Sequence, residues 1–247
     1  MSRTRLEEHR RRWREKPVLE RVYAPWFEAL LAATAPGGRV LEVGAGPGSL
    51  AAFAREKRPD LRFFASDLCA APWNDLAADA GHLPFADGVV QAVVGLDILH
   101  HLARPAVFFH EVARVLGDGG RLALVEPWIT PFSWLVYRLI HHERCRLSVY
   151  PWDPFPGGDK DAFDGDAAVP WRIVRDTDAA RWRALGFAPP QRRLVNAFGY
   201  LLSLGFRSGS LLPVGAAEAA VALDRWATPL APLGALRAAL TWNRVRA

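Results

Sequence analysis

Cysteine is scarce in this sequence, which contains only Cys69 and Cys145 among its 247 residues. Two cysteines are too few for a disulfide framework, and neither belongs to a Cys-x-x-Cys pair. Such sparse cysteine is typical of a protein kept in a reducing compartment. We therefore expect a cytoplasmic protein.

Long apolar runs are also missing. No window reaches the ~18 apolar residues that a transmembrane helix needs, and residues 194–206, which come nearest, are too few to span a bilayer. Residues 1–16 form a charged run without the apolar core of a secretory signal. We therefore expect neither a transmembrane helix nor a secretory signal. Any membrane contact is expected to be peripheral, through the basic N-terminal helix or the apolar residues 200–223.

Lysine is nearly absent, because Lys16, Lys57 and Lys160 are the only ones, and arginine carries most of the net charge of +5. Apart from an N-terminal cluster the basic residues are scattered, which is not the pattern of a nucleic-acid surface. Hydrophobic residues make up 51% and charged residues 23% of the chain, as in an ordinary globular protein. The length fits one large α/β domain with an inserted lid, and we expect no nucleic-acid partner.

One stretch, residues 39–50 (RVLEVGAGPGSL), combines a buried strand, a glycine turn and the start of a helix. Gly44, Gly46 and Gly48 allow a sharp turn and let a ligand approach where a Cβ would clash. Glu42 lies near the end of the strand, where burying an acid is costly unless a partner meets it. A ligand's ammonium group would supply that partner. The stretch therefore predicts a nucleotide-sized site.

An acid followed by Gly-x-Gly-x-Gly resembles the first motif of class I S-adenosylmethionine (SAM) dependent methyltransferases, in particular the small-molecule enzymes of the Methyltransferase type 11 kind. Glu42, Gly44, Gly46 and Gly48 occupy those positions. The alternative is the turn of an NAD-binding Rossmann fold. That fingerprint requires Gly-x-Gly-x-x-Gly or Ala, whereas Ser49 holds the sixth position and Gly48 comes one residue early. The resemblance implies SAM as the cofactor.

The resemblance extends to two further acids. Asp67 follows a predicted strand over 61–66, about 20 residues beyond the glycine turn, where the family binds the ribose hydroxyls. An ordinary turn or helix-capping aspartate is the alternative. In the segment 78–87 (ADAGHLPFAD), the resemblance implies that Asp79 accepts from the adenine amino group and that the Ala80 N–H meets a ring nitrogen.

The elements that follow come in the order that the family shows. Residues 89–96 form an apolar run typical of a central parallel strand. Residues 97–102, directly after that run, resemble the family segment that faces both the methionine part of SAM and the acceptor. Leu96, at the end of the run, is predicted to contact the cofactor. Residues 105–116 predict an amphipathic helix, stopped by glycines at 117–120 and followed by a strand over 121–126.

We therefore expect an α/β protein with a Rossmann-like, seven-stranded, mostly parallel sheet and helices on both faces. Residues 191–196 and 239–246 are expected to form its antiparallel terminal hairpin. The predicted parts are N-terminal cap helices (1–37), a SAM-binding core (38–126), an aromatic-rich lid (127–172) with a helix over 132–143, and a C-terminal part of the core (173–247) with a helix over 177–185.

Two histidines and an acid are the candidates for catalysis. Methyl transfer depends on alignment rather than on a nucleophilic side chain, but a hydroxyl acceptor benefits from a general base. Adjacent residues on a helical turn point about 100° apart, so only one of His100 and His101 is expected to face the site, and we favour His101. Glu126 ends strand five and is expected to border the acceptor side. A surface position for His101 and a capping role for Glu126 are the alternatives.

Residues 141–145 (HHERC) offer histidine, glutamate and cysteine side chains close together. The His-Glu-x-x-His arrangement of zinc proteases is absent, and adjacent histidines on one helix are not expected to bind one ion. We therefore expect no metal cofactor.

The acceptor is the remaining question. Trp128, Trp134 and Trp152 either wall a pocket for a hydrophobic small-molecule or lipid-like acceptor or fasten the insertion to the domain. The leading hypothesis is SAM-dependent methyl transfer to such an acceptor at oxygen. The alternatives are a SAM-binding partner protein without turnover and an NAD-linked oxidoreductase, against which the position of Gly48 argues. The oligomeric state is unknown from the sequence.

Overall fold

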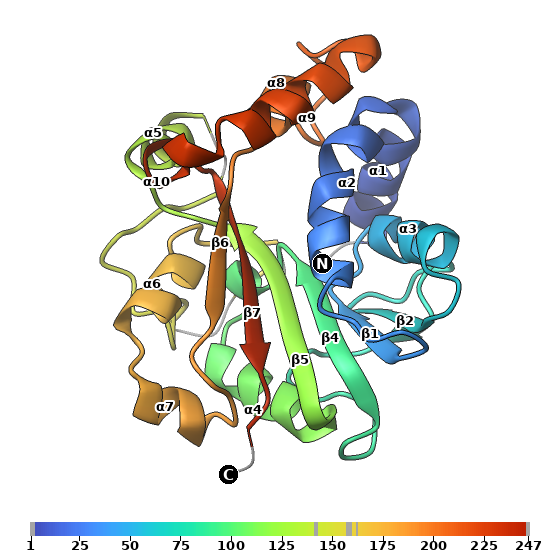
Figure 1. Ribbon diagram of the computed structural model, residues 1–247, viewed down its shortest axis with the longest axis vertical. Coiled ribbons are helices and arrows are strands. Elements are labelled where there is room, and N and C mark those ends of the chain that lie inside the picture. The colour runs from blue at the N-terminus through green and yellow to red at the C-terminus, as the bar shows by residue number, and fades with distance from the viewer. Residues whose placement is uncertain (1–2, 141–142, 157–159, 162, 246–247) are drawn as a thin grey trace.

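The computed structural model of the protein describes residues 3–140, 143–156, 160–161 and 163–245. At its centre is a seven-stranded sheet with the strand order β3-β2-β1-β4-β5-β7-β6 (Figure 1). The strands are β1 Arg39–Val43, β2 Arg62–Asp67, β3 Leu76–Ala77, β4 Val90–Leu96, β5 Leu116–Pro127, β6 Gln191–Val195 and β7 Arg237–Asn243.

The sheet is parallel except at one side. β1 pairs in parallel with β2 and β4, β2 with β3, and β4 with β5. β7 runs antiparallel to both of its neighbours, β5 and β6. This topology confirms the predicted fold class, including the antiparallel terminal pair. The carboxyl ends of the parallel strands share one edge, which is where open α/β sheets bind ligands.

Helices cover both faces of the sheet, as the apolar central strands require. Alternate residues of one strand serve opposite cores, so that Val40 belongs to one hydrophobic cluster and Leu41 to the other. The first cluster includes side chains of α2 (Val18–Leu31) and α3 (Ser49–Lys57), and the second includes side chains of α4 (Pro105–Val115), α6 (Val169–Asp176) and α7 (Ala179–Ala184).

A second group of helices lies beyond the carboxyl edge of the parallel strands, in the upper part of Figure 1. They are α1 (Arg3–Glu15) with α2, α5 (Pro131–Leu139), α8 (Phe198–Ser203), α9 (Ala217–Trp226) and α10 (Ala231–Gly234). α2 packs against α8 and α9, and α10 packs against α5. Three distant parts of the chain therefore meet here. Within the described residues, no helix has the length and apolar character to cross a membrane.

The strand β5 is longer than predicted. It begins at Leu116, so the glycines at 117–120, expected to separate helix from strand, lie within it. Val90 pairs with Leu116 but Ala92 pairs with Arg121, so the ladder shifts register at this point. The extra residues bulge out of the ladder, which glycine permits because it has no side chain to place.

Two helical predictions are also corrected. α5 ends at Leu139 and does not continue to Glu143, and residues 141–142 lie outside the described residues. The predicted helix over 177–185 is the shorter α7, preceded by a separate helix, α6. Asp178 separates the two, because its side chain caps α7 by accepting a hydrogen bond from the Arg181 N–H at 2.7 Å.

Phe109 of α4 is the side chain on which we expect the second core to depend most. It is fully buried, and its ring centroid lies 5.3 to 5.9 Å from four other rings, those of Trp152, Trp182, Phe187 and Trp242. We expect Phe109→Ala to lower the free energy of unfolding by about 3–5 kcal/mol, measured by urea denaturation. Phe64→Ala, at a partly exposed position of β2, is the control. A loss no larger than that of the control would contradict this role.

Candidate active site

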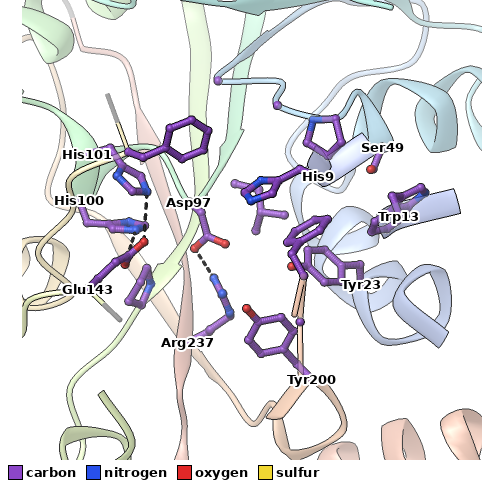
Figure 2. A pocket seen from close by; sticks show the side chains of 18 of the residues that line it. His9, Trp13, Tyr23, Ser49, Asp97, His100, His101, Glu143, Tyr200 and Arg237 are labelled. Atoms are coloured by element: carbon purple, nitrogen blue, oxygen red, sulfur yellow. Dashed lines mark hydrogen bonds and ion pairs between the residues drawn. The ribbon is translucent and has the colours of Figure 1, made fainter. Parts of the chain in front are cut away.

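A cavity of about 510 Å³ opens at the carboxyl ends of β1 and β4. The glycine turn after β1 forms one part of its lining, and other parts come from α1, α2, α5, the segment around α8, and the residues that follow β4. Figure 2 shows labelled side chains from several of these parts. A volume of this size suits a small molecule. Its position is the one expected from the sheet topology.

Three glycines give the turn after β1 its shape. Gly44, Gly46 and Gly48 have φ angles of 69°, 53° and 74°, in the region that L side chains rarely adopt. A Cβ on Gly44 would lie 2.9 Å from Ile98, and one on Gly48 would lie 2.7 Å from Trp73. Gly44 and Gly46 line the cavity, whereas Gly48 faces the Trp73 ring. The backbone is therefore accessible from the cavity at the first two glycines.

Glu42 lines the cavity with a nearly completely buried side chain. The residue is 2% exposed, and its buried Oε2 has no hydrogen-bond partner in the part of the chain that the structure describes. Burial, together with the nearby Asp67 carboxylate, raises the pKa of Glu42 well above its ordinary value. A cationic ligand group at this oxygen would offset the cost of burial.

Asp67, at the end of β2, supports the glycine turn. Its Oδ2 accepts a hydrogen bond from the Gly46 N–H at 2.9 Å, and its Oδ1 accepts one from the Cys69 N–H at 3.0 Å. Asp67 is buried and does not line the cavity. The structure therefore brings Asp67 to the turn, and its contact with a ribose stays a prediction.

Asp79 and Ala80 lie in the loop after β3, outside the lining of the cavity. The Asp79 Oδ1 accepts a hydrogen bond from the Gly81 N–H at 2.8 Å, and the side chain is largely exposed. Leu96, in contrast, lines the cavity from the end of β4. The adenine contacts of Asp79 and Ala80 also stay predictions.

Two residues that sequence analysis missed cover the glycine turn. The Trp73 indole N–H donates to the Gly46 carbonyl at 2.8 Å. Arg10 of α1 donates to the Pro47 carbonyl, and its guanidinium lies 4.9 Å from the Trp73 ring centroid. These contacts fasten α1 to the turn. Neither residue carries a local signal, because Trp73 lies outside any periodic segment and Arg10 is one arginine among many in α1.

Glu126, at the end of β5, is completely buried and fixes the turn that carries the two histidines. Its Oε1 accepts hydrogen bonds from the Ile98 and Leu99 N–H groups at 2.8 and 2.7 Å. Its Oε2 lies 2.7 Å from the His100 Nδ1. Glu126 does not line the cavity, so any effect on an acceptor must pass through His100.

His100 and His101 both line the cavity, which corrects the expectation that only one of them faces it. They belong to the short 3-10 turn η1 (Leu99–His101), and their ring centroids lie 4.1 Å apart. His100 Nε2 lies 3.3 Å and His101 Nε2 3.6 Å from the Glu143 carboxylate, as Figure 2 shows. The angle of about 100° between adjacent residues describes the backbone alone. The side chains extend from it so that both rings face the same carboxylate.

The two imidazoles differ in their electrostatic surroundings. Burial opposes the charging of His100, but the carboxylates of Glu143 and Glu126 outweigh it and raise its pKa to about 10. Burial and the adjacent His100 lower the pKa of His101 to about 4. The pair therefore combines one cationic and one neutral ring near neutral pH.

An ion pair between Asp97 and Arg237 lies between the histidine cluster and Tyr200 in Figure 2. Asp97 follows β4 with a φ of 56°, which is unusual for a residue other than glycine. Arg237 begins β7, and its guanidinium lies 4.4 and 5.0 Å from the ring centroids of Trp26 and Tyr200. Burial opposes the charge of Arg237, and the Asp97 carboxylate raises the pKa of this guanidinium.

The three tryptophans considered for the acceptor pocket do not line the cavity. Trp128 and Trp152 are buried in the second core, and Trp134 lies beside the guanidinium of Arg138. Trp128 and Trp152 therefore fasten the segment after β5 to the domain. The aromatic lining comes from other elements and comprises Trp13, Tyr23, Phe27, Tyr137, Phe163, Tyr200 and Phe206.

Comparison with known proteins first defines the class of protein to which the fold belongs. A family model described as a methyltransferase domain matches residues 41–124. The solved structure of geranyl diphosphate C-methyltransferase from Streptomyces coelicolor A3(2) has the same fold, with a TM-score of 0.54 at 15% identity, over 90% of this chain and 79% of that one. The fold is therefore that of the Rossmann-like methyltransferases.

Sequence relatives then give the family. A demethylmenaquinone methyltransferase of Beutenbergia cavernae is 32% identical over 190 residues, which are 66% of this chain and 73% of that protein. The chain belongs to the class I SAM-dependent methyltransferases, which confirms the predicted family and its cofactor, SAM.

Other relatives match shorter parts. An uncharacterized methyltransferase of Mycobacterium sp. (strain JLS) is 36% identical over 119 residues, 44% of this chain and 47% of that protein. A fatty-acid O-methyltransferase of Mycolicibacterium smegmatis is 40% identical over 96 residues, 34% of this chain and 35% of that protein. The chain spans about half the length, or less, of these two relatives.

We expect Glu42→Gln to stabilise the ligand-free protein at neutral and higher pH. A carboxyl with a raised pKa holds its proton more tightly in the folded state, so its ionisation costs stability as the pH rises above the ordinary value of 4.5. The free energy of unfolding of the parent should therefore fall, relative to the variant, between pH 5 and pH 8. Urea denaturation at both pH values measures this. Glu56→Gln, at an exposed position of α3, is the control, and a variant less stable than the parent at pH 8 would contradict the expectation.

Proposed function

We propose that the protein transfers the methyl group of SAM to an oxygen atom of a hydrophobic small-molecule or lipid-like acceptor. The observation that carries the proposal is a single cavity that contains both Glu42 with the glycine turn and a wall of aromatic and aliphatic side chains. A fatty-acid O-methyltransferase and a demethylmenaquinone methyltransferase among the relatives are in keeping with an apolar acceptor.

The residues around the glycine turn fit the amino-acid end of SAM. The Glu42 Oε2 and the Ser49 Oγ are buried polar atoms without a hydrogen-bond partner in the described residues, and both residues line the cavity. A carboxylate is suited to an α-ammonium group and a hydroxyl to an α-carboxylate. When bound, SAM supplies a methyl group on a sulfonium, whose sulfur keeps the electron pair of the broken S–C bond and leaves as S-adenosylhomocysteine.

The apolar part of the cavity fits the acceptor. It is lined by Val136 of α5, Ile140 directly after that helix, Tyr200 and Leu201 of α8, and Leu236. Such a surface excludes water from a displacement that needs the acceptor oxygen in line with the methyl group. An acceptor hydroxyl loses its proton as its oxygen takes the methyl group. Transfer of that proton to His101 stays a prediction from the sequence.

Calorimetric titration with SAM, S-adenosylhomocysteine and NADH tests the class of ligand. We expect SAM and S-adenosylhomocysteine to bind and NADH to bind far more weakly. Glu42→Gln should weaken SAM binding about 10–100-fold, because it removes a charge-assisted hydrogen bond worth roughly 1.5–3 kcal/mol. Glu56→Gln should bind as the parent does.

Turnover separates the remaining hypotheses. Purified protein, SAM and a panel of hydroxyl or carboxyl compounds with apolar chains should release S-adenosylhomocysteine together with methylated product. SAM binding without release by any compound would favour a SAM-binding partner protein. Preferential NADH binding would overturn the proposal in favour of an oxidoreductase.

We also propose a peripheral contact with an anionic membrane through the helices beyond the strand ends. Their exposed apolar side chains are Leu135, Leu139, Leu223, Trp226, Leu230 and Leu233, together with Leu211 and Val214 between α8 and α9. Arg138, Arg207 and Arg225 are exposed in the same segments. Apolar side chains beside arginines are suited to the interface of an anionic bilayer, and such a position would bring a lipid-like acceptor near the cavity.

Vesicle flotation tests the membrane contact. The protein should float with vesicles that contain anionic lipid, and less so at higher salt. Exchange of Trp226 (78% exposed) and Leu233 (63% exposed) for serine should lower the vesicle affinity about tenfold, because two large apolar contacts are lost. Leu68→Ser, at an equally exposed site after β2, is the matched control (58% exposed). Equal flotation of all three proteins would contradict the contact.

A further inference from the structure

We propose that His100, His101 and Glu143 bind a divalent transition-metal ion, and that Zn²⁺ is the ion that this donor set fits. The three side chains come together in the cavity, and their ligating atoms lie within 4.8 Å of one another. The binding of the ion does not depend on the proposed function, but its role toward an acceptor does. Sequence analysis expected no metal because it considered residues 141–145 alone, without the two histidines that folding brings to Glu143.

Hydrogen bonds at the other ring nitrogens orient both imidazoles as ligands. The His100 Nδ1 lies 2.7 Å from the Glu126 Oε2, and the His101 Nδ1 lies 3.2 Å from the Asp164 carbonyl oxygen. Because a carbonyl can only accept, the His101 Nδ1 carries the proton in that hydrogen bond. Binding of an ion would displace the second proton of the cationic His100, and the proton that stays on each Nδ1 would then leave each Nε2 lone pair directed at the ion. Metal-binding histidines are held in this way, with the second nitrogen donating to a carboxylate or a carbonyl.

The distances agree with a shared ion. The two Nε2 atoms lie 3.3 and 3.6 Å from the Glu143 carboxylate oxygens. Both distances exceed the about 2.7–2.9 Å of a charge-assisted N–H···O hydrogen bond. A tetrahedral ion with bonds of about 2.0–2.1 Å keeps its ligand atoms about 3.3–3.4 Å apart. The two separations involve different oxygens of Glu143, Oε2 for His100 and Oε1 for His101, and both are close to the separation of two ligands of one ion.

A second group of potential ligands, Asp97, His100 and Glu126, is less suitable. Glu126 uses its carboxylate for two backbone N–H groups and for His100. Asp97 is paired with Arg237. An ion at that position would have to displace these partners. For an ion bound beside Glu143, Glu126 would instead accept a hydrogen bond from the Nδ1 of the ligand His100. This is the more favourable use of a buried carboxylate.

The donor set indicates the ion and its role. Two imidazole nitrogens and one carboxylate suit Zn²⁺ better than Mg²⁺ or Ca²⁺, which prefer oxygen ligands. Three protein ligands leave a tetrahedral ion one position for another ligand, and all three side chains line the cavity. If the proposed function holds, an acceptor oxygen would take that position. His101 would then act as a ligand of the ion, in place of the proton acceptor predicted from sequence.

Calorimetry with ZnCl₂ on chelator-treated full-length protein tests the site. We expect one Zn²⁺ per chain and at least about 100-fold weaker binding by His101→Ala and by Glu143→Gln. His110→Ala, which removes an exposed histidine of α4, is the matched control and should bind as the parent does. Co²⁺ should give visible absorption bands in the parent and in the control, but not in Glu143→Gln. Melting curves establish that the variants are folded.

Two results would overturn the proposal. One is the absence of saturable binding of one Zn²⁺ per chain, and the other is binding by folded His101→Ala and Glu143→Gln that matches the parent. SAM titration of the chelator-treated protein separates this proposal from the proposed function. SAM binding without Zn²⁺ binding removes the ion alone, whereas Zn²⁺ binding without SAM binding removes the methyltransferase activity and leaves the metal site.

Discussion

Four acidic side chains near the carboxyl ends of parallel strands impose the constraint around which the site is built. Buried carboxylates are stable only where cations or N–H donors meet them. Asp67 is met by the Gly46 N–H of the glycine turn, Asp97 by Arg237, and Glu126 by the Leu99 N–H and the His100 ring of η1. These bonds fix the glycine turn, the histidine turn and the start of β7 relative to one another. Glu42 alone of the four keeps a buried carboxylate oxygen without a hydrogen-bond partner in the described residues, which points to a ligand there.

The glycine turn and the acid before it could be predicted because their signals are local. A buried strand, alternate glycines and an acid lie within residues 39–50, and their spacing is itself the structure of the turn. β1 begins at Arg39 and ends at Val43, directly before the first glycine of the turn, as residues 39–50 predict. The glycines at 117–120 misled the prediction of β5, because glycine permits a bulge within a strand as readily as a stop between elements.

The acceptor half could not be predicted because its contacts join distant parts of the chain. Asp97 and Arg237 are 140 residues apart in sequence, and no local pattern marks either as the partner of the other. The tryptophans after β5 were a poor guide to the acceptor pocket, because their packing also depends on distant parts of the chain. Trp128 and Trp152 are buried in the core that includes side chains of α4 and β7, and α1, α2 and α8 supply much of the aromatic lining of the cavity.

The Asp97–Arg237 pair explains how one cavity can serve both halves of the proposed reaction. Methyl transfer removes positive charge from sulfur, so a bare carboxylate beside the sulfur would stabilise the reactant more than the transition state. Arg237 neutralises Asp97, and both residues line the cavity together with Glu42 and the histidines. In the proposed reaction, Glu42 would instead meet an ammonium group, which keeps its charge throughout. In the proposed reaction, the group that attracts the cofactor is thereby separated from the reacting atoms. Binding of the cofactor can then be strong without raising the barrier to methyl transfer.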